Sequence, residues 1–214
     1  MELGSRLFER HNNDRDQRLD SRESLLPAFF VLNRYCKRHP NDAPALQLLG
    51  LVCERIGQVE SGMEHTQRAI AILEAAYEES EDPVTERQFT IATSNLARMS
   101  LSVLDHETAL EGFGSVLGLL PENDENDERM TIMRAQAHFG SGLASFHLGN
   151  LEDALIAFEA ALEAASDHRV IKGQVVVLYA QTLWAMDTEG SRESAKSRLL
   201  ERWVSYQMTC RVQV

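Results

Sequence analysis

The run Gly142-Leu-Ala-Ser-Phe-His-Leu-Gly-Asn150, followed by Ala154, Phe158 and Ala161, decides the fold of this chain. Its first glycine is a small residue on one helix, and its closing Leu-Gly-Asn makes a turn into a second helix. Ala154, Phe158 and Ala161 follow at helical spacing and share one face of that second helix. Small residues let two antiparallel helices touch, and the aromatic ring fills the gap between hairpins. The run therefore predicts a helical hairpin that repeats along the chain.

The template recurs at intervals and resembles the tetratricopeptide (TPR) repeat. The residues that define the repeats are Gly50, Gly57, Ala97, Ala109, Phe113, Pro121, Gly142, Gly149, Ala154, Phe158, Ala161, Ala180 and Ala195. The resemblance implies an all-α, helix-turn-helix solenoid, a right-handed superhelix of about four to five repeats. Such arrays present surfaces to partners and seldom carry out chemistry.

We expect a polar lead-in at residues 1–21, a repeat array at 22–204 and an atypical tail at 205–214. The array divides into units near 22–42, 43–82, 83–123, 124–168 and 169–204. Successive small residues of the first helices lie farther apart than the usual ~34 residues of a TPR unit. The extra residues are polar and compatible with helix, so we expect lengthened helices joined by acidic loops. Asp82 is the expected N-cap of one such helix, and Pro83 its first residue.

The net charge of −12 is unevenly distributed. Residues 1–40 carry 8 Lys/Arg against 6 Asp/Glu, and residues 41–214 carry 13 against 27. An acidic body repels the phosphate backbone, which argues against direct binding of nucleic acid. The N-terminus is polar, and no apolar run approaches the ~20 residues of a membrane span. We expect a cytoplasmic chain, with the nucleus as a second location, and no membrane association.

Three cysteines, Cys36, Cys53 and Cys210, are not spaced as metal ligands and read as buried small hydrophobes of a reducing compartment. The run Gly112–Gly118 superficially resembles a dinucleotide-binding loop, but it has Leu117 at the sixth position and lies inside an expected helix. We interpret it as a helix weakened by glycines and compensated by close helix–helix contact. The acidic run 123–128 lacks the glycine of a calcium loop. The sequence predicts no enzyme, no cofactor and no metal site.

In TPR arrays the concave groove is lined by the first helix of each hairpin. The corresponding candidate groove or partner-surface residues are Leu51, Ile91, Arg98, Leu101, Phe139, Leu143 and Phe146. Arg98 stands alone among apolar neighbours, which argues against the cationic clamp of chaperone-binding TPR domains. An apolar stripe at helical spacing is also typical of a core. Packing within the chain and binding of a protein partner therefore both stay open.

Several stretches also resemble the TPR scaffold subunit of the fungal superkiller (Ski) complex. They are Leu46–Gly57, Leu73–Pro83, Gly142–Gly149, Gln181–Met186 and Ala195–Leu200. The resemblance implies protein partners, an RNA helicase and WD-repeat subunits, and a part in exosome-dependent 3′–5′ decay of cytoplasmic mRNA. This chain is far shorter than that subunit and looks like a fragment or truncated homologue. The alternative is a general TPR adaptor or co-chaperone unrelated to RNA decay.

Overall fold

The computed structural model describes residues 23–120, 127–165, 168–186, 190–197, 199 and 200. Within these ranges the regular structure is helical throughout, which confirms the all-α expectation. The chain divides into two compact units, Met1–Asp105 and His106–Val214, and each is described by itself. This division falls inside the third expected repeat. The expected lead-in, the tail from 205, Pro121 and Cys210 lie outside the described residues.

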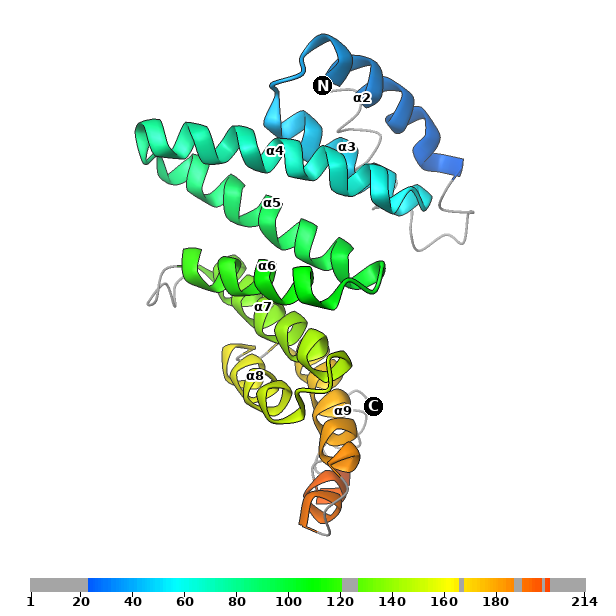
Figure 1. The fold of residues 1–214 in the computed structure, drawn as a ribbon, viewed down its shortest axis with the longest axis vertical. Helices are drawn as coiled ribbons and strands as arrows, with labels where there is room; N and C mark the ends of the chain where they lie inside the picture. Colours follow the sequence, from blue (N-terminus) through cyan, green and yellow to red (C-terminus); the bar gives the residue numbers. More distant parts are fainter. Residues whose placement is uncertain (1–22, 121–126, 166–167, 187–189, 198, 201–214) are drawn as a thin grey trace, which may run out of the picture. The chain divides into compact units, whose positions relative to one another are not determined.

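In its described residues, 23–105, the first unit contains four α-helices (Figure 1). They are α2 (Leu26–Arg38), preceded by the 3₁₀ turn η2 (Glu23–Leu25), α3 (Ala43–Ile56), α4 (Val59–Ser80) and α5 (Pro83–Ser102). Asp82 caps α5 by accepting a hydrogen bond from the backbone nitrogen of Thr85 at 3.0 Å, and Pro83 opens the helix, both as expected. With 22 and 20 residues, α4 and α5 are the lengthened helices that the repeat spacing predicts.

Close contact between α3 and α4 depends on two glycines. A β-carbon on Gly50 would lie 2.9 Å from the carbonyl oxygen of Gly62 and would also collide with the Thr66 hydroxyl. Gly57 ends α3 at φ +88°, a left-handed conformation that a side chain disfavours. Gly50 and Gly62 thus let α3 and α4 approach each other, and Gly57 turns the chain between them.

The core of the first unit is continuous across α2, α3, α4 and α5. Leu32, Leu46, Leu49 and Val52 are fully buried in it, and Cys36 and Cys53 lie in the same cluster. Burial raises the pKa of the Cys53 thiol to about 11, with a smaller contribution from Cys36. These two cysteines are buried small hydrophobes, as their dispersed spacing indicated.

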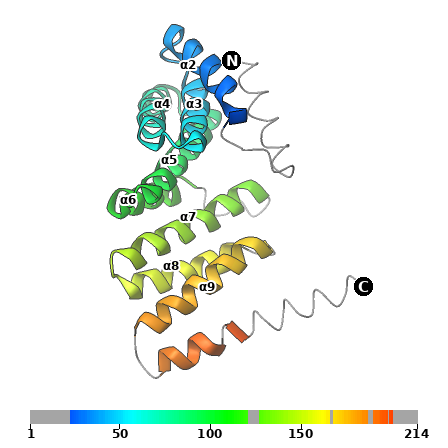
Figure 2. The ribbon, with the colours of Figure 1, turned by 90° about the vertical axis from the view of Figure 1, so that its right-hand side faces the viewer.

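The second unit contains α6 (His106–Leu119), α7 (Glu128–His147), α8 (Leu151–Ala164) and α9 (Arg169–Ala185), and residues 190–197 are helical. Figure 2 shows α7, α8 and α9 lying one beside the next. Asp127 caps α7, accepting from the backbone nitrogen of Arg129 at 2.9 Å. Gly149 turns the chain between α7 and α8 at φ +84°.

Aromatic rings fill the gaps that glycines leave in this unit. A β-carbon on Gly142 would lie 2.6 Å from the Phe158 ring, and one on Gly140 would lie 2.8 Å from Cδ2 of Phe113. Phe158 is fully buried together with Ala154 and Ala161, so the deciding stretch has the predicted register. Ala97, Ala109, Ala180 and Ala195 are also buried, at most 2% exposed.

The interpretation of the Gly112–Gly118 run was only partly right. The glycines do lie inside a helix, α6, so a phosphate-binding loop is not formed there. However, a β-carbon on Gly114 or on Gly118 would meet nothing within 4 Å. Close contact does not compensate these two glycines, because they face away from α7. The close approach comes instead from Phe113, which faces Gly140.

Candidate partner-binding surface

In the first unit the groove positions lie on α3 and α5. Leu51, Ile91 and Leu101 are half-buried, and Arg98 is exposed. Gln47, one turn before Leu51 on α3, donates from Nε2 to the backbone oxygen of Gln88 at 3.2 Å. These neighbouring first helices therefore contact each other through side chains of the groove positions.

The prediction that Arg98 stands alone among apolar neighbours is wrong, because it has an acidic partner. Its guanidinium forms two hydrogen bonds with Glu54 on α3, and Nη2 lies 2.8 Å from Oε2. The Glu54 side chain is only 13% exposed, against 48% for Arg98. The carboxylate was missed because it lies 44 residues away, although it occupies the register position one turn after Leu51. Arg98 is thus already paired and does not offer a free cation for a partner's carboxylate.

In the second unit Phe139, Leu143 and Phe146 lie along α7, and each is half-buried. Phe139 and Phe146 pack against the buried cluster of this unit. The rings of Phe139 and Phe158 have their centroids 6.1 Å apart. These aromatic residues therefore contribute to the core and also leave part of their surface accessible.

The corresponding positions on α9 were not singled out from the sequence. Gly142 on α7 and Ala180 on α9 occupy the same position of the repeat. In this register Trp184 corresponds to Phe146 and Gln181 to Leu143, and Trp184 and Gln181 are both exposed. Trp184 is 55% exposed, and the guanidinium carbon of Arg192 lies 5.5 Å from the centre of its ring. The repeat register itself would have found this tryptophan.

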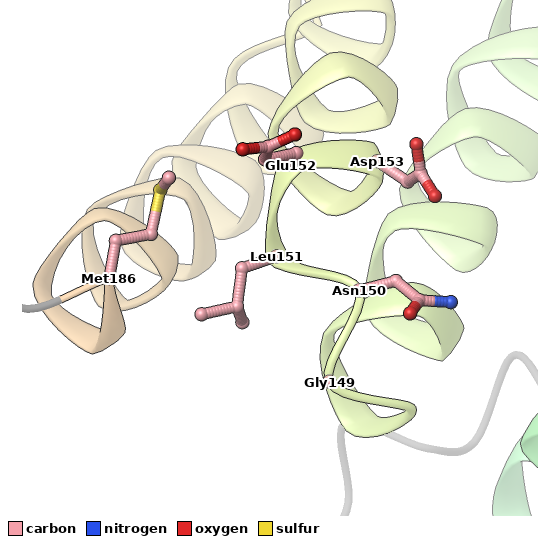
Figure 3. Close-up of a pocket in the computed structure, with 6 residues that line it drawn as sticks. All are labelled: Gly149, Asn150, Leu151, Glu152, Asp153 and Met186. Carbon is pink, nitrogen blue, oxygen red and sulfur yellow. The ribbon is translucent and has the colours of Figure 1, made fainter.

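A shallow hollow of about 460 Å³ lies elsewhere in the second unit, beside the turn between α7 and α8. Its lining residues are Gly149, Asn150, Leu151, Glu152, Asp153 and Met186 (Figure 3). In Figure 3, Leu151 and Glu152 extend on the side of Met186 at the end of α9, whereas Asn150 and Asp153 lie on the other side. The lining includes neither a nucleophilic side chain nor a histidine, and the hollow is open to solvent.

Within the described ranges, no three His, Cys, Asp or Glu side chains gather closely enough to hold a metal ion. Every described helix is too short or too polar to span a bilayer. Burial lowers the pKa of His65 and of His138, and Arg68 and Arg134 respectively add to the effect. Both imidazoles are half-buried.

Comparison with known proteins gives a consistent relationship. No family model matches the chain. Superkiller protein 3 of Schizosaccharomyces pombe is 31% identical over 175 residues, and that of Saccharomyces cerevisiae is 28% identical over 191 residues. These alignments cover 81% and 89% of this chain, but only 12% and 13% of the two relatives. The chain thus spans about an eighth of the length of the relatives it matches.

Solved structures show the same fold at low identity. A kinesin light chain with nearly identical TPR-like repeats from Podosopora anserina superposes with a TM-score of 0.72 at 18% identity, covering 99% of both chains. MamA from Desulfovibrio magneticus RS-1 gives 0.60 at 16% identity, covering 94% of this chain and 96% of that one. At such identities the likeness concerns the fold. The chain is therefore homologous to a segment of Superkiller protein 3 and has the fold of TPR-like repeat proteins.

Proposed function

We propose that this chain is part of a non-catalytic protein–protein interaction scaffold, a Ski-complex-like TPR subunit that supports exosome-dependent 3′–5′ decay of cytoplasmic mRNA. The observation that carries the proposal is the homology to Superkiller protein 3, which extends over 81% of the chain at 31% identity. A relationship of this extent includes whole hairpins and the lengthened helices between them. The few positions that all TPR repeats share would not by themselves produce 31% identity over 175 residues.

The groove positions support a role in holding protein segments. They carry apolar side chains on α7 and an exposed Trp184 on α9, whose ring lies beside Arg192 of the following helical stretch 190–197. Tryptophan and arginine are the residue types most often found at energetically dominant positions of protein interfaces. Amide groups at Gln174 and Gln181, both exposed, can hydrogen-bond to the backbone of an extended partner segment.

The resemblance suggests that the partners are an RNA helicase and WD-repeat subunits. A co-chaperone role is less well supported. Such a role needs a cationic clamp for a partner's carboxylate, and the Arg98 guanidinium is already paired with Glu54. A general adaptor unrelated to RNA decay remains the competing function. The two differ in whether the chain can replace its counterpart inside a working Ski-type subunit.

A chimeric subunit tests the proposal. The homologous segment of the S. pombe Superkiller protein 3 is replaced by this chain, and the half-life of an exosome-dependent reporter mRNA is measured in cells lacking the natural subunit. We expect the chimera to restore decay and to co-purify with the helicase and WD-repeat subunits. The control inserts the kinesin light chain repeats, which share the fold at 18% identity. Equal decay with both inserts, or no decay with this chain, would contradict the proposal.

A point variant then tests the groove within that chimera. Trp184→Ala removes an exposed side chain, so the fold should be kept while partner capture weakens. Val84→Ala is the matched control, since Val84 is 62% exposed at the start of α5 and is not one of the groove positions. Equal partner capture by both variants would remove Trp184 from the proposed contact surface.

A further inference from the structure

The outer face of α2 combines apolar and basic side chains. Leu26 and Phe30 are 41% and 65% exposed, and Arg34 and Lys37 follow them as exposed residues on the same side. The helix contains three basic residues and no acidic one. The Phe30 ring meets Phe29 edge-on, with centroids 5.6 Å apart, and is thereby held in place on the surface. An exposed aromatic ring beside cations is costly to leave in water and favours a partner of opposite charge.

The outer face of α8 has the opposite character. Glu152, Ile156, Glu159 and Glu163 are all exposed at helical spacing, with Ile156 at 66%. The helix contains four acidic residues and no Lys or Arg. Glu159 accepts a hydrogen bond from the Tyr179 hydroxyl at 2.7 Å, which fixes that carboxylate on the surface. This face is therefore an acidic stripe around one apolar side chain.

The two stripes are complementary in charge, and an apolar and a charged residue are separated by the same distance on each. On α2 the apolar residue Phe30 precedes Lys37 by seven residues, and on α8 Ile156 precedes Glu163 by the same seven. With the helices side by side and parallel, Phe30 faces Ile156, Arg34 faces Glu159, and Lys37 faces Glu163. We propose that the α2 face of one copy of this chain binds the α8 face of a second copy. This homotypic contact goes beyond the scaffold role and does not depend on RNA decay.

The size of the contact sets its strength. Helices of 13 and 14 residues are about 20 Å long, so a single helix pair buries less than the ~800 Å² per partner of a standard interface. The association should therefore be weak, reversible and sensitive to salt. Because the two faces differ, the contact is heterologous, and each copy keeps one face free for the next. Association should therefore proceed head to tail as concentration rises, either growing openly or closing into a ring.

Two variants that each silence one face provide the test. The α2-silent variant carries Phe30→Gln, Arg34→Gln and Lys37→Gln. The α8-silent variant carries Glu152→Gln, Ile156→Gln and Glu163→Gln, and it keeps Glu159 because of its hydrogen bond to Tyr179. All six changed residues are exposed, so helix content and thermal melting should stay as in the wild-type chain. A control variant, Arg55→Gln with Val84→Gln, changes one exposed basic and one exposed apolar residue elsewhere.

Sedimentation velocity from about 10 to about 300 μM brackets the weak affinity expected for a contact of this size. The wild-type chain and the control should associate increasingly with concentration, and added salt should suppress this. Each silent variant by itself should have an association constant at least about tenfold lower. An equimolar mixture of the two should form a complex of no more than two copies, because each supplies the face the other lacks.

Three outcomes would overturn the proposal. A wild-type chain that stays monomeric over the whole range would leave both faces to other proteins. A silent variant that associates as strongly as the wild type would place the contact elsewhere, for example at the groove. Two silent variants that fail to combine when mixed would mean that the faces do not bind each other.

Discussion

The Phe158 ring on α8 lies where a side chain at residue 142 on α7 would begin. A β-carbon on Gly142 would be 2.6 Å from both Cδ1 and Cε1 of the ring. Phe158 is fully buried by this arrangement. The Phe158 ring therefore requires a glycine at position 142. Truncating the ring and enlarging the glycine should each lower the stability of the hairpin, for different reasons.

Truncating the ring should be costly. Phe158→Ala removes a fully buried aromatic side chain and leaves a cavity opposite Gly142, so we expect a loss of about 3–5 kcal/mol in the free energy of unfolding. Urea denaturation followed by circular dichroism measures it. Phe30→Ala, on a side chain that is 65% exposed, is the control and should change stability little. A loss below about 1 kcal/mol for Phe158→Ala would contradict its role as the core residue of this hairpin.

Adding a methyl group at two helical glycines should have opposite effects. Gly142→Ala forces its β-carbon against Phe158 and should destabilise by about 1–3 kcal/mol. Gly114→Ala meets open space on α6 and should stabilise by about 0.5–1 kcal/mol, since alanine is the better helix former. Unfolding curves of the two variants beside the wild-type chain give the comparison. Stabilisation by both, or destabilisation by both, would contradict the contacts described for α6 and α7.

The buried thiols should be inert in the folded chain. Burial raises the pKa of Cys36 and raises that of Cys53 to about 11, so little thiolate exists at neutral pH, and the sulfur atoms are shielded. In a Cys210→Ser background, a thiol reagent should label neither cysteine in native buffer and both in urea. Labelling in native buffer at the rate of a free thiol would show that the α2–α3 contact opens readily.

Stability should decrease under mild acid because of two histidines. Burial lowers the pKa of His65 and His138 in the folded chain, so the unfolded chain binds more protons on these rings as the pH falls. Their contribution is therefore fully present above the unfolded value of about 6.5 and is lost as the pH falls through that value towards the lowered folded ones. Urea midpoints at about pH 7.5 and about pH 5.5 measure the decrease. His65→Gln with His138→Gln should reduce it, whereas exposed His39→Gln should not.

Binding of single-stranded RNA by the isolated chain should be weak, with a dissociation constant above about 1 μM at physiological salt. The reason is the charge of residues 41–214, which carry 13 Lys/Arg against 27 Asp/Glu. Fluorescence anisotropy with a labelled oligonucleotide over a salt series tests it. Tight binding with a steep salt dependence would require a basic groove and would contradict this prediction.

The repeat register could be predicted from the sequence because small and aromatic residues have few roles inside a helix. The pattern assigned one position to each of three residues. Gly142 and Phe158 do meet between the two helices, and Gly149 does turn the chain. Gly114 was misread because a glycine's sequence context does not show whether a neighbour approaches it. Glu54 was missed because ion pairs between hairpins join residues 44 positions apart. Which partner covers the groove depends on molecules outside the chain, so no pattern within it could decide this.

The pairing of Phe113 on α6 with Gly140 on α7 has a consequence for how such an array can grow or shrink by gene duplication. The ring and the glycine that receives it are encoded on opposite sides of a hairpin boundary. A duplicated segment that begins at α7 would contain Gly140 but not the Phe113 ring that packs against it. A segment that ends at α6 would contain Phe113 but not Gly140. Only duplications or deletions by whole repeat periods preserve every such match. Recombination breakpoints that survive selection should therefore recur at equivalent register positions.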